Sequence, residues 1–357
     1  MPRVFNFSAG PGMLPLEVLD ASAKALVDYQ GKGFGIAECS HRGKEFDGVM
    51  DEALARCRAL LAVPDSHDIL FVQGGATALF SIIAQSFAGA GADYLVSGEW
   101  SQKAAKAAPK GIARIVASSE ATGFDRCPER EAWTLSPDAG YLHVCSNETV
   151  HGHRLAEWPE HPALVVDASS EFMSRPHPIG RAALVYAGAQ KNLGPAGVVV
   201  VIVRKDLYAR IPASVPGIFN LAKLAEAKSM VNTPPTFGIY MLLETFRWLE
   251  RQGGLLAMER RNAEKAGLLY AAVDASGGFY KGTVAVPAQR SHMNATFRLP
   301  TAELDDAFVG QAAKAGMVAL KGYRSVGGIR ASIYNAMPVE GCRALAAFMA
   351  DFARRHG

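Results

Sequence analysis

Apolar residues follow two different spacings along the first part of the chain. Over residues 14–30, 45–62 and 76–87 they recur at helical spacing, which predicts helices. Short continuous apolar runs predict strands at residues 68–72, 93–96, 112–116, 141–145, 163–166, 183–186 and 198–203. Several runs are apolar throughout, which is typical of strands covered on both faces. The pattern therefore predicts an α/β fold with a mainly parallel sheet flanked by helices.

The pattern changes after Thr233. It predicts long helices over residues 237–251 and 255–273. The tail adds strands at residues 294–299 and 328–333 and amphipathic helices at residues 301–315 and 339–355. A chain of 357 residues suits two domains. We expect a large domain over residues 13–254 and a smaller α+β domain made of residues 1–12 and 255–357.

Composition and charge bear on the binding partners and the cellular location to expect. Hydrophobic residues make up 49% of it, and Lys plus Arg number 37 against 34 for Asp plus Glu. So small a positive excess gives no reason to expect nucleic acid or a membrane surface. The longest apolar run, residues 197–203, is far shorter than a membrane span. With five cysteines in no CxxC pair and no secretory h-region, we expect a cytoplasmic protein without a metal site.

Lys191 has an unusual setting. It lies between two predicted strands, and the segment around it, residues 186–197, is rich in small residues that let a flat ligand approach the backbone. A lysine in a confined site loses its proton easily, as Schiff-base chemistry requires. From this segment alone, a surface lysine in a Gly-rich turn is an equal alternative.

Three further segments carry candidate chemistry. Asp167 ends an apolar run, where a carboxylate can pair with a pyridinium nitrogen, although a helix N-cap is the alternative. The turn Gly74-Gly75 precedes a predicted helix, so it is either a phosphate site or an ordinary loop. Trp100 follows a strand and can stack on a planar cofactor or belong to the core.

Taken together, these segments resemble the class V aminotransferases, which use pyridoxal 5'-phosphate. The resemblance runs over essentially the whole chain and rests on residues 6–11, 40–42, 74–76, 146–149, 188–192, 232–235 and 327–335. Within the family, the chain is most similar to members that transfer the amino group of L-glutamate to 3-phosphohydroxypyruvate. The products are O-phospho-L-serine, for L-serine biosynthesis, and 2-oxoglutarate. Some bacterial members also aminate a phosphorylated four-carbon oxo acid in pyridoxine biosynthesis.

The resemblance implies a role for each matching position. Lys191 is expected to bind the cofactor covalently and to carry the proton between the substrate and the cofactor. The other expected cofactor contacts are Ala76, Thr77, Trp100, Thr149, Asp167 and Gln190, with Asn232 and Thr233 reaching the neighbouring subunit's cofactor. The last two imply a homodimer with shared active sites.

The substrate residues also follow from the resemblance. Arg330 is expected to hold the α-carboxylate, which suits a bidentate guanidinium. The distal phosphate or γ-carboxylate is expected to meet His41 and Arg42, with Tyr323 and Arg324 from the other subunit. Ser8 completes the expected substrate site. Surface arginines are the alternative interpretation.

The chain departs from the family pattern at three positions. Many members carry arginine in place of Thr77, histidine in place of Tyr323, and methionine or phenylalanine in place of Ala168. The first two changes remove a cation and an imidazole, which weakens the expected phosphate clamp. The cofactor assignment does not depend on them.

Three other functions remain as alternatives. An alanine–glyoxylate or serine–glyoxylate aminotransferase would not need the cluster of basic residues. A cysteine desulfurase needs a nucleophilic cysteine on a mobile loop, whereas Cys342 lies in the predicted helix 339–355. A non-catalytic binding protein on the same fold would be expected to have lost Lys191 or Asp167.

Overall fold

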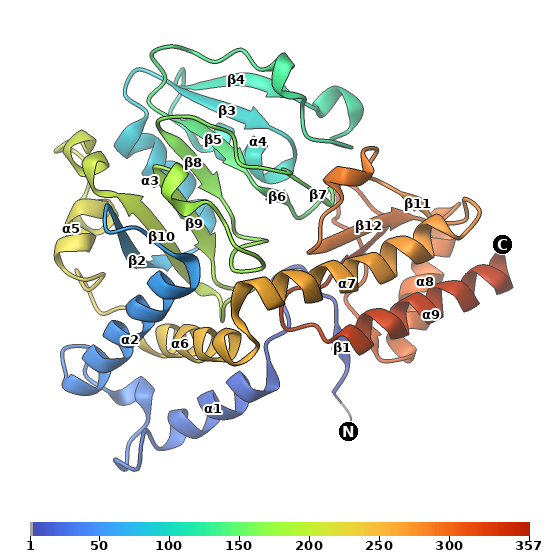
Figure 1. Ribbon diagram of the computed structural model, residues 1–357, viewed down its shortest axis with the longest axis horizontal. Coiled ribbons are helices and arrows are strands. Elements are labelled where there is room, and N and C mark those ends of the chain that lie inside the picture. Colours follow the sequence, from blue (N-terminus) through green and yellow to red (C-terminus); the bar gives the residue numbers. More distant parts are fainter. Residues whose placement is uncertain (1–2) are drawn as a thin grey trace.

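A seven-stranded sheet forms the centre of the computed structural model, which describes residues 3–357 (Figure 1). Its strand order is β2-β10-β9-β8-β5-β3-β4. The strands are β2 (His67–Gly74), β3 (Ala92–Val96), β4 (Ala113–Ser118), β5 (Leu142–Cys145), β8 (Leu164–Asp167), β9 (Leu184–Gly188) and β10 (Gly197–Arg204). β10 runs antiparallel to both of its neighbours, and the other neighbouring pairs are parallel. The predicted mainly parallel sheet is confirmed.

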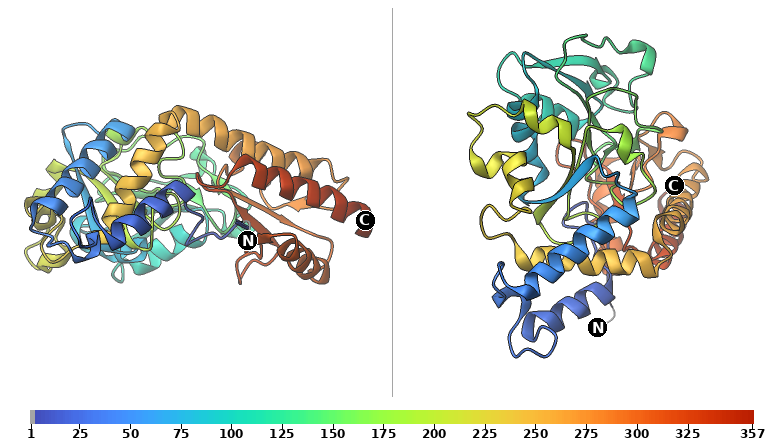
Figure 2. Two further views of the ribbon diagram at one scale, coloured as in Figure 1. Left: turned by 90° about the horizontal axis from the view of Figure 1, so that it is seen from below. Right: turned by 60° about the vertical axis from the view of Figure 1, so that its left-hand side comes forward.

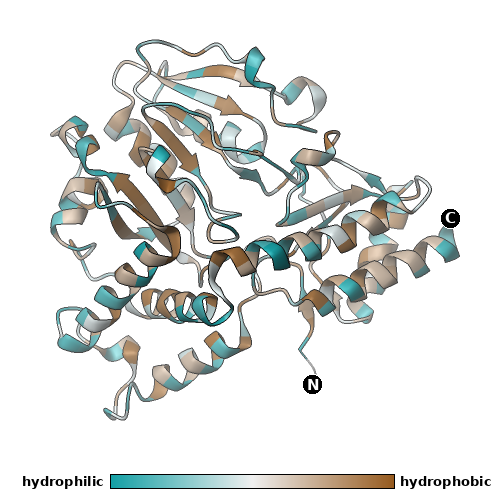
Figure 3. Cartoon of the chain, in the orientation of Figure 1, coloured by the Kyte–Doolittle hydropathy of each residue, from teal (hydrophilic) through white to brown (hydrophobic). Residues whose placement is uncertain are grey.

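Helices cover both faces of this sheet. One face packs against α1 (Leu16–Val27), α2 (Lys44–Leu61) and α6 (Thr236–Arg251), and the other against α3 (Ala76–Phe87), α4 (Glu99–Ala107) and α5 (Leu221–Glu226). β10 shows why its sequence is apolar throughout: Val198 and Val200 enter one core, whereas Val199 and Val201 enter the other. The sheet is accordingly among the most hydrophobic parts of the chain (Figure 3).

A third hydrophobic core belongs to the C-terminal part, which extends to one side of the sheet (Figure 2). Its helices are α7 (Gly254–Asp274), α8 (Ala302–Lys314) and α9 (Val339–His356). They pack with a sheet of order β11-β12-β14, formed by Lys281–Gly282, Asn294–Arg298 and Ile329–Ser332. Phe7 and Met13 also enter this core. The domain boundaries proposed from the sequence stay a prediction.

The remaining elements are short. β1 (Phe5–Asn6) pairs in parallel with β13 (Met317–Val318), and β6 (Asn147–Glu148) pairs with β7 (His153–Arg154). Short 3-10 helices span Ile36–Glu38, Glu120–Thr122, Arg130–Ala132, Ile179–Arg181, Lys205–Arg210, Gly217–Phe219 and Pro287–Gln289. No helix within residues 3–357 is both long and apolar enough to cross a membrane.

α4 is the main helix that the sequence pattern did not predict. Its buried residues are Ser101, Ala104 and Ala105, so small side chains form the face that packs on the sheet. A search for large apolar residues at helical spacing cannot find such a helix. Its location matters, because it carries Trp100 immediately after β3.

Candidate active site

The candidate site lies where the carboxyl ends of the parallel strands meet at one edge of the sheet. Asp167 ends β8, and Gly188 ends β9 three residues before Lys191. β3 ends shortly before Trp100, and β5 ends shortly before Thr149. Because these strands are parallel and adjacent in the sheet, residues that are far apart in the sequence converge at this edge.

Lys191 is buried, with 8% of its surface exposed. Its Nζ donates a hydrogen bond of 2.9 Å to the hydroxyl of Thr149 and lies 5.4 Å from the ring centroid of Trp100. Burial lowers the pKa of the Lys191 ammonium, and the nearby Asp167 carboxylate opposes this effect. A lysine in such a setting can act as a neutral amine, which is the form that attacks a carbonyl carbon.

Asp167 is also buried, and its Oδ1 accepts a hydrogen bond from the backbone N–H of Ser169 at 2.9 Å. This contact with a backbone N–H two residues later is the kind that the alternative role as a helix N-cap predicted for Asp167. Burial raises the pKa of Asp167, whereas the charge of Lys191 lowers it. The carboxylate is therefore both fixed in orientation by the backbone and electrostatically coupled to the lysine. It has the properties that a partner for a protonated ring nitrogen needs.

Glu148 fixes the start of α4 and with it the position of Trp100. Its carboxylate accepts hydrogen bonds from the backbone N–H groups of Trp100 and Ser101, at 3.2 and 3.0 Å, and from the Ser101 hydroxyl at 2.6 Å. A side chain at Gly98 would collide with it, because an added Cβ would lie 2.6 Å from the Glu148 Cδ. Glu148 lies inside the motif 146–149, but sequence reasoning gave it no role.

The N-terminal loop packs against Lys191, which the sequence pattern did not indicate. The backbone N–H of Gly12 donates to the carbonyl of Gln190 at 2.7 Å, and an added Cβ at Gly12 would lie 2.9 Å from the Lys191 carbonyl oxygen. The hydroxyl of Tyr334 donates to the carbonyl of Ala9 at 2.6 Å. The loop that carries Ser8 is thereby held over the lysine.

The start of α3 is the candidate phosphate site. Gly74 ends β2 with a φ of 121°, and α3 begins two residues later at Ala76, so the N–H groups of its first turn face the site edge. Thr77 is exposed on this turn. Asn232 and Thr233 lie in an exposed loop nearby, where the Asn232 amide donates to the Gln73 side chain at 2.9 Å.

Arg330 and Tyr323 approach the same site from the C-terminal part. Arg330 lies on β14, its guanidinium carbon is 5.9 Å from the Tyr323 ring centroid, and its charge opposes protonation of Lys191. The Tyr323 hydroxyl accepts a hydrogen bond from Lys103 of the same chain at 3.2 Å. The hydroxyl therefore lies beside Trp100 in its own chain, and the expectation that Tyr323 serves the other subunit stays a prediction.

The other expected substrate residues are more peripheral. His41 and Arg42 lie in the turn before α2, and Arg324 is exposed in the loop after Tyr323. Within residues 3–357, no hydrogen bond joins any of these three side chains to Lys191, Thr149 or Asp167. Their part in substrate binding stays a prediction.

Pyridoxal phosphate fits the groups that this edge brings together. There is a buried carboxylate for a ring nitrogen, a hydroxyl for a ring oxygen, an indole for stacking and a helix N-terminus for the phosphate. The indole Nε1 of Trp100 is buried and has no hydrogen-bond partner among the described residues. Such an orphaned polar atom is typical of a site that a bound group completes.

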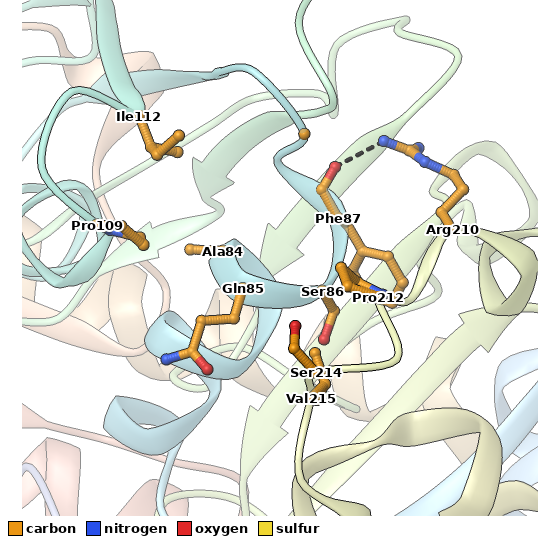
Figure 4. A pocket seen from close by; sticks show the side chains of 11 residues that line it. Ala84, Gln85, Ser86, Phe87, Pro109, Ile112, Arg210, Pro212, Ser214 and Val215 are labelled. Carbon is orange, nitrogen blue, oxygen red and sulfur yellow. Dashed lines mark hydrogen bonds between the residues drawn. The ribbon is translucent and has the colours of Figure 1, made fainter.

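A separate cavity lies away from this edge, beyond the end of α3 (Figure 4). Its volume is about 360 Å³, and Arg210 is among the residues that line it. The guanidinium of Arg210 donates to the backbone carbonyls of Phe87 and Gly140 at 2.6 and 2.9 Å, so its charge serves to cap the end of α3. None of the expected site residues within the described chain lines this cavity.

Cys342 does not have the environment of a nucleophile. It is fully buried within α9, in the core of the C-terminal part. Burial raises the pKa of its thiol to about 12, so the thiolate is scarce at neutral pH. The desulfurase alternative loses its candidate residue.

Comparisons with known proteins show the family of this chain. The family model described as aminotransferase class-V matches residues 4–345. The chain is 49% identical to phosphoserine aminotransferase of Laribacter hongkongensis and 48% identical to that of Geobacillus kaustophilus, each over 99% of both chains. Among solved structures, phosphoserine aminotransferase of Bacillus circulans subsp. alkalophilus matches with a TM-score of 0.97 and 47% identity over 99% of both chains.

Two further solved structures extend the comparison. The structure of phosphoserine aminotransferase from Trichomonas vaginalis with bound PLP has a TM-score of 0.94 and 39% identity, over 98% of this chain and all of that one. Ureidoglycine-glyoxylate aminotransferase of Bacillus subtilis has a TM-score of 0.76 at 15% identity, over 100% of this chain and 94% of that one. At that identity the likeness concerns the fold alone.

Proposed function

Because the chain belongs to the class V aminotransferase family, we infer that it is an enzyme with phosphoserine transaminase activity. It reversibly transfers the amino group of L-glutamate to 3-phosphohydroxypyruvate and forms O-phospho-L-serine and 2-oxoglutarate. The observation that carries this function is the full-length identity of 48–49% to phosphoserine aminotransferases. The arrangement of Lys191, Thr149 and Asp167 at one sheet edge supports it.

The cofactor is pyridoxal 5'-phosphate, which when bound supplies an electron sink for negative charge at the substrate Cα. We assign its covalent attachment to Lys191 and its ring nitrogen to Asp167. Trp100 would stack on the ring, and Thr149 would hydrogen-bond the ring oxygen. The phosphate would meet the first turn of α3 at Ala76 and Thr77, together with Gln190.

The chain's own residues then account for proton transfer. Lys191, as a neutral amine, takes the proton from the substrate Cα and later returns one to the reacting centre. Burial lowers its pKa, which favours the neutral form between these steps. The loop over Lys191, from Ser8 to Gly12, limits the access of water. Both amino acids use the same site in turn, which gives ping-pong kinetics.

The substrate anions have separate partners in this proposal. Arg330 holds the α-carboxylate that all substrates share, because its partly buried guanidinium can bind a carboxylate with two hydrogen bonds. His41, Arg42 and Arg324, with Tyr323, hold the distal phosphate or γ-carboxylate. A glyoxylate aminotransferase would not need this second set.

We further propose a cytoplasmic homodimer with shared active sites. Asn232 and Thr233 are exposed, as residues that reach a partner's cofactor must be. Mixing two inactive variants tests the sharing: Lys191→Ala and Asn232→Ala chains would regain activity on exchange, because one site of the mixed dimer would be intact. Unchanged inactivity after exchange, with dimers present by sedimentation, would contradict it.

The experiment that tests the activity is a single-turnover spectrum. Purified holoenzyme is mixed with O-phospho-L-serine in one cuvette and with L-serine or L-alanine in another. The absorbance of the lysine-bound cofactor should be lost at low concentrations of O-phospho-L-serine and not of the other two. An equal response to L-alanine would support aminotransferase activity but contradict specificity for the phosphorylated substrate.

A further inference from the structure

We propose that Lys103, acting with Tyr323, is a residue that determines specificity for the phosphorylated substrate. It supplies a positive charge beside Trp100, the proposed stacking residue. The inference rests on the proposed function and concerns a residue that sequence reasoning did not single out. Lys103 would act partly by positioning Tyr323 and partly through its own charge.

The position of Lys103 comes from α4. It follows Trp100 by three residues, so both side chains lie on the same side of the helix. Its Nζ is 4.7 Å from the Trp100 ring centroid and 3.2 Å from the Tyr323 hydroxyl oxygen. The Tyr323 ring in turn lies next to Arg330. The ammonium therefore stands between the proposed stacking residue and the proposed α-carboxylate site.

The charge of Lys103 is permanent at neutral pH. Glu99 lies 2.9 Å from its Nζ and is the main cause that raises the pKa of the ammonium. An ammonium has three donors, of which Glu99 and Tyr323 use two, so one is left for an anion. The Lys103 side chain is 40% exposed, and a pair so open to water contributes little to stability.

The contact also changes Tyr323. Because its hydroxyl oxygen accepts from Lys103, its own hydrogen points elsewhere and becomes a stronger donor. A neutral phenol alone carries no positive charge for an anion. A phenol polarised by an ammonium has both a donor and a neighbouring charge.

The competing explanation is that Lys103 is a surface residue held by Glu99 and by the Trp100 ring. Such a purely structural role would disturb Trp100, so its loss would affect every substrate alike. A role in phosphate recognition would instead act on substrates in proportion to their distal charge. Kinetics with substrates of different distal groups separate the two.

The test is Lys103→Met in the holoenzyme, with half-reactions of O-phospho-L-serine, L-glutamate and L-serine. We expect kcat/KM for O-phospho-L-serine to fall by about 10-fold or more, which is the usual effect of losing one charge-assisted hydrogen bond. The loss should appear mainly in KM, should be smaller for L-glutamate, and should be absent for L-serine. Lys103→Arg should retain most of the activity.

Matched variants control for unspecific effects. Lys106→Met lies one turn further along α4, where Lys106 is exposed and its Nζ donates to Gln102 at 2.9 Å, so it should change none of these constants. Tyr323→Phe should reproduce part of the loss, and its effect should not add to that of Lys103→Met. Tyr323→His introduced into the Lys103→Met chain should restore affinity for O-phospho-L-serine. The cofactor absorbance of each variant reports correct folding.

Two results would overturn the proposal. One is an unchanged kcat/KM for O-phospho-L-serine in Lys103→Met, and the other is an equal loss with L-serine. Failure of the proposed function is read separately, from the wild type: an enzyme that does not prefer O-phospho-L-serine to L-serine refutes both inferences. A wild-type preference that survives Lys103→Met refutes this one alone.

Discussion

The Nζ of Lys191 lies 2.9 Å from the hydroxyl oxygen of Thr149, although 42 residues separate them in the sequence. The contact exists because β5 and β8 are neighbouring parallel strands, and β9 is the next strand in the sheet. It places the amine among groups that all suit one planar cofactor.

Replacement of Lys191 tests the centre of the site. Lys191→Ala removes the amine that binds the cofactor and moves the proton, so turnover should fall to background and the absorbance of the lysine-bound cofactor should disappear. Lys106→Ala, an exposed lysine on α4, is the control and should be fully active. A Lys191→Ala enzyme that still turns over O-phospho-L-serine would refute the assignment.

Asp167→Asn keeps the shape of the side chain and removes its charge. Without the carboxylate a protonated ring nitrogen loses its ion pair, so kcat should fall by about 10²-fold, which corresponds to ~3 kcal/mol. Asp206→Asn, at a surface pair with Arg204, should have no such effect. Cofactor binding measured by absorbance distinguishes loss of the cofactor from loss of its activation.

The ionisation of Asp167 should determine how cofactor binding to the apoprotein depends on pH in the acid range. Burial raises the pKa of its carboxyl group above the ordinary value, so the carboxylate is lost at a higher pH than an exposed aspartate would be. The affinity for pyridoxal phosphate should therefore decline as pH falls through that raised pKa. A titration of cofactor binding in wild type and Asp167→Asn checks this, since the variant should lack the decline.

Arg330→Ala should weaken the binding of every substrate. All the amino acids and oxo acids share the α-carboxylate, so KM should rise by about 10- to 100-fold for O-phospho-L-serine, L-glutamate and L-serine alike. This uniform effect is the opposite of the one expected for Lys103. Arg343→Ala is the matched control, because Arg343 lies on α9 and forms an exposed ion pair with Glu264 of α7. A selective loss for one substrate would assign Arg330 to the distal anion instead.

The buried Lys265 should make the free energy of unfolding depend on pH. It is fully buried, its Nζ donates to the carbonyls of Ile333 and Tyr334, and burial lowers its pKa to about 7. Between that pH and about 10.4, the unfolded chain holds a proton that the folded chain lacks, so the free energy of unfolding should rise with pH. The slope from one such group is at most about 1.4 kcal/mol per pH unit.

Lys265→Met removes this contribution. Denaturant unfolding between pH 7.5 and pH 9.5 should show a smaller rise in the variant than in the wild type. The variant should also be less stable at pH 9.5, because two carbonyls lose their donor. Lys281→Met, at an exposed position, should keep the wild-type slope. Equal slopes in all three chains would mean that Lys265 stays protonated in the folded state.

Much of the sheet could be predicted from the sequence because its strands are buried on both faces. The run at β10 is apolar at every position, since its residues enter the two cores alternately. Lys191 and Asp167 could be singled out for a related reason: Asp167 is the one charged residue of β8 and ends it, and Lys191 follows the end of the uncharged strand β9 by three residues. The rule that strand ends form the ligand site then suggested that they meet.

The parts that could not be predicted depend on contacts between distant segments. The buried face of α4 consists of small residues, which give no apolar signal in the sequence. The N-terminus of α4 is capped by Glu148, which belongs to another segment of the chain. The position of Tyr323 beside Lys103 joins residues that are 220 positions apart in the sequence. Neither spacing nor composition indicates such a pairing.

The pairing of β1 with β13 has a consequence for the order in which the protein is made. The loop over Lys191 is held from both sides: Phe7 donates its N–H to Val318, and Ala9 accepts from Tyr334. Both partners follow all seven strands of the main sheet in the sequence, so they leave the ribosome after the sheet does. A nascent chain can thus assemble its sheet before the loop is fixed. The lysine is covered only after Val318 and Tyr334 have been synthesised.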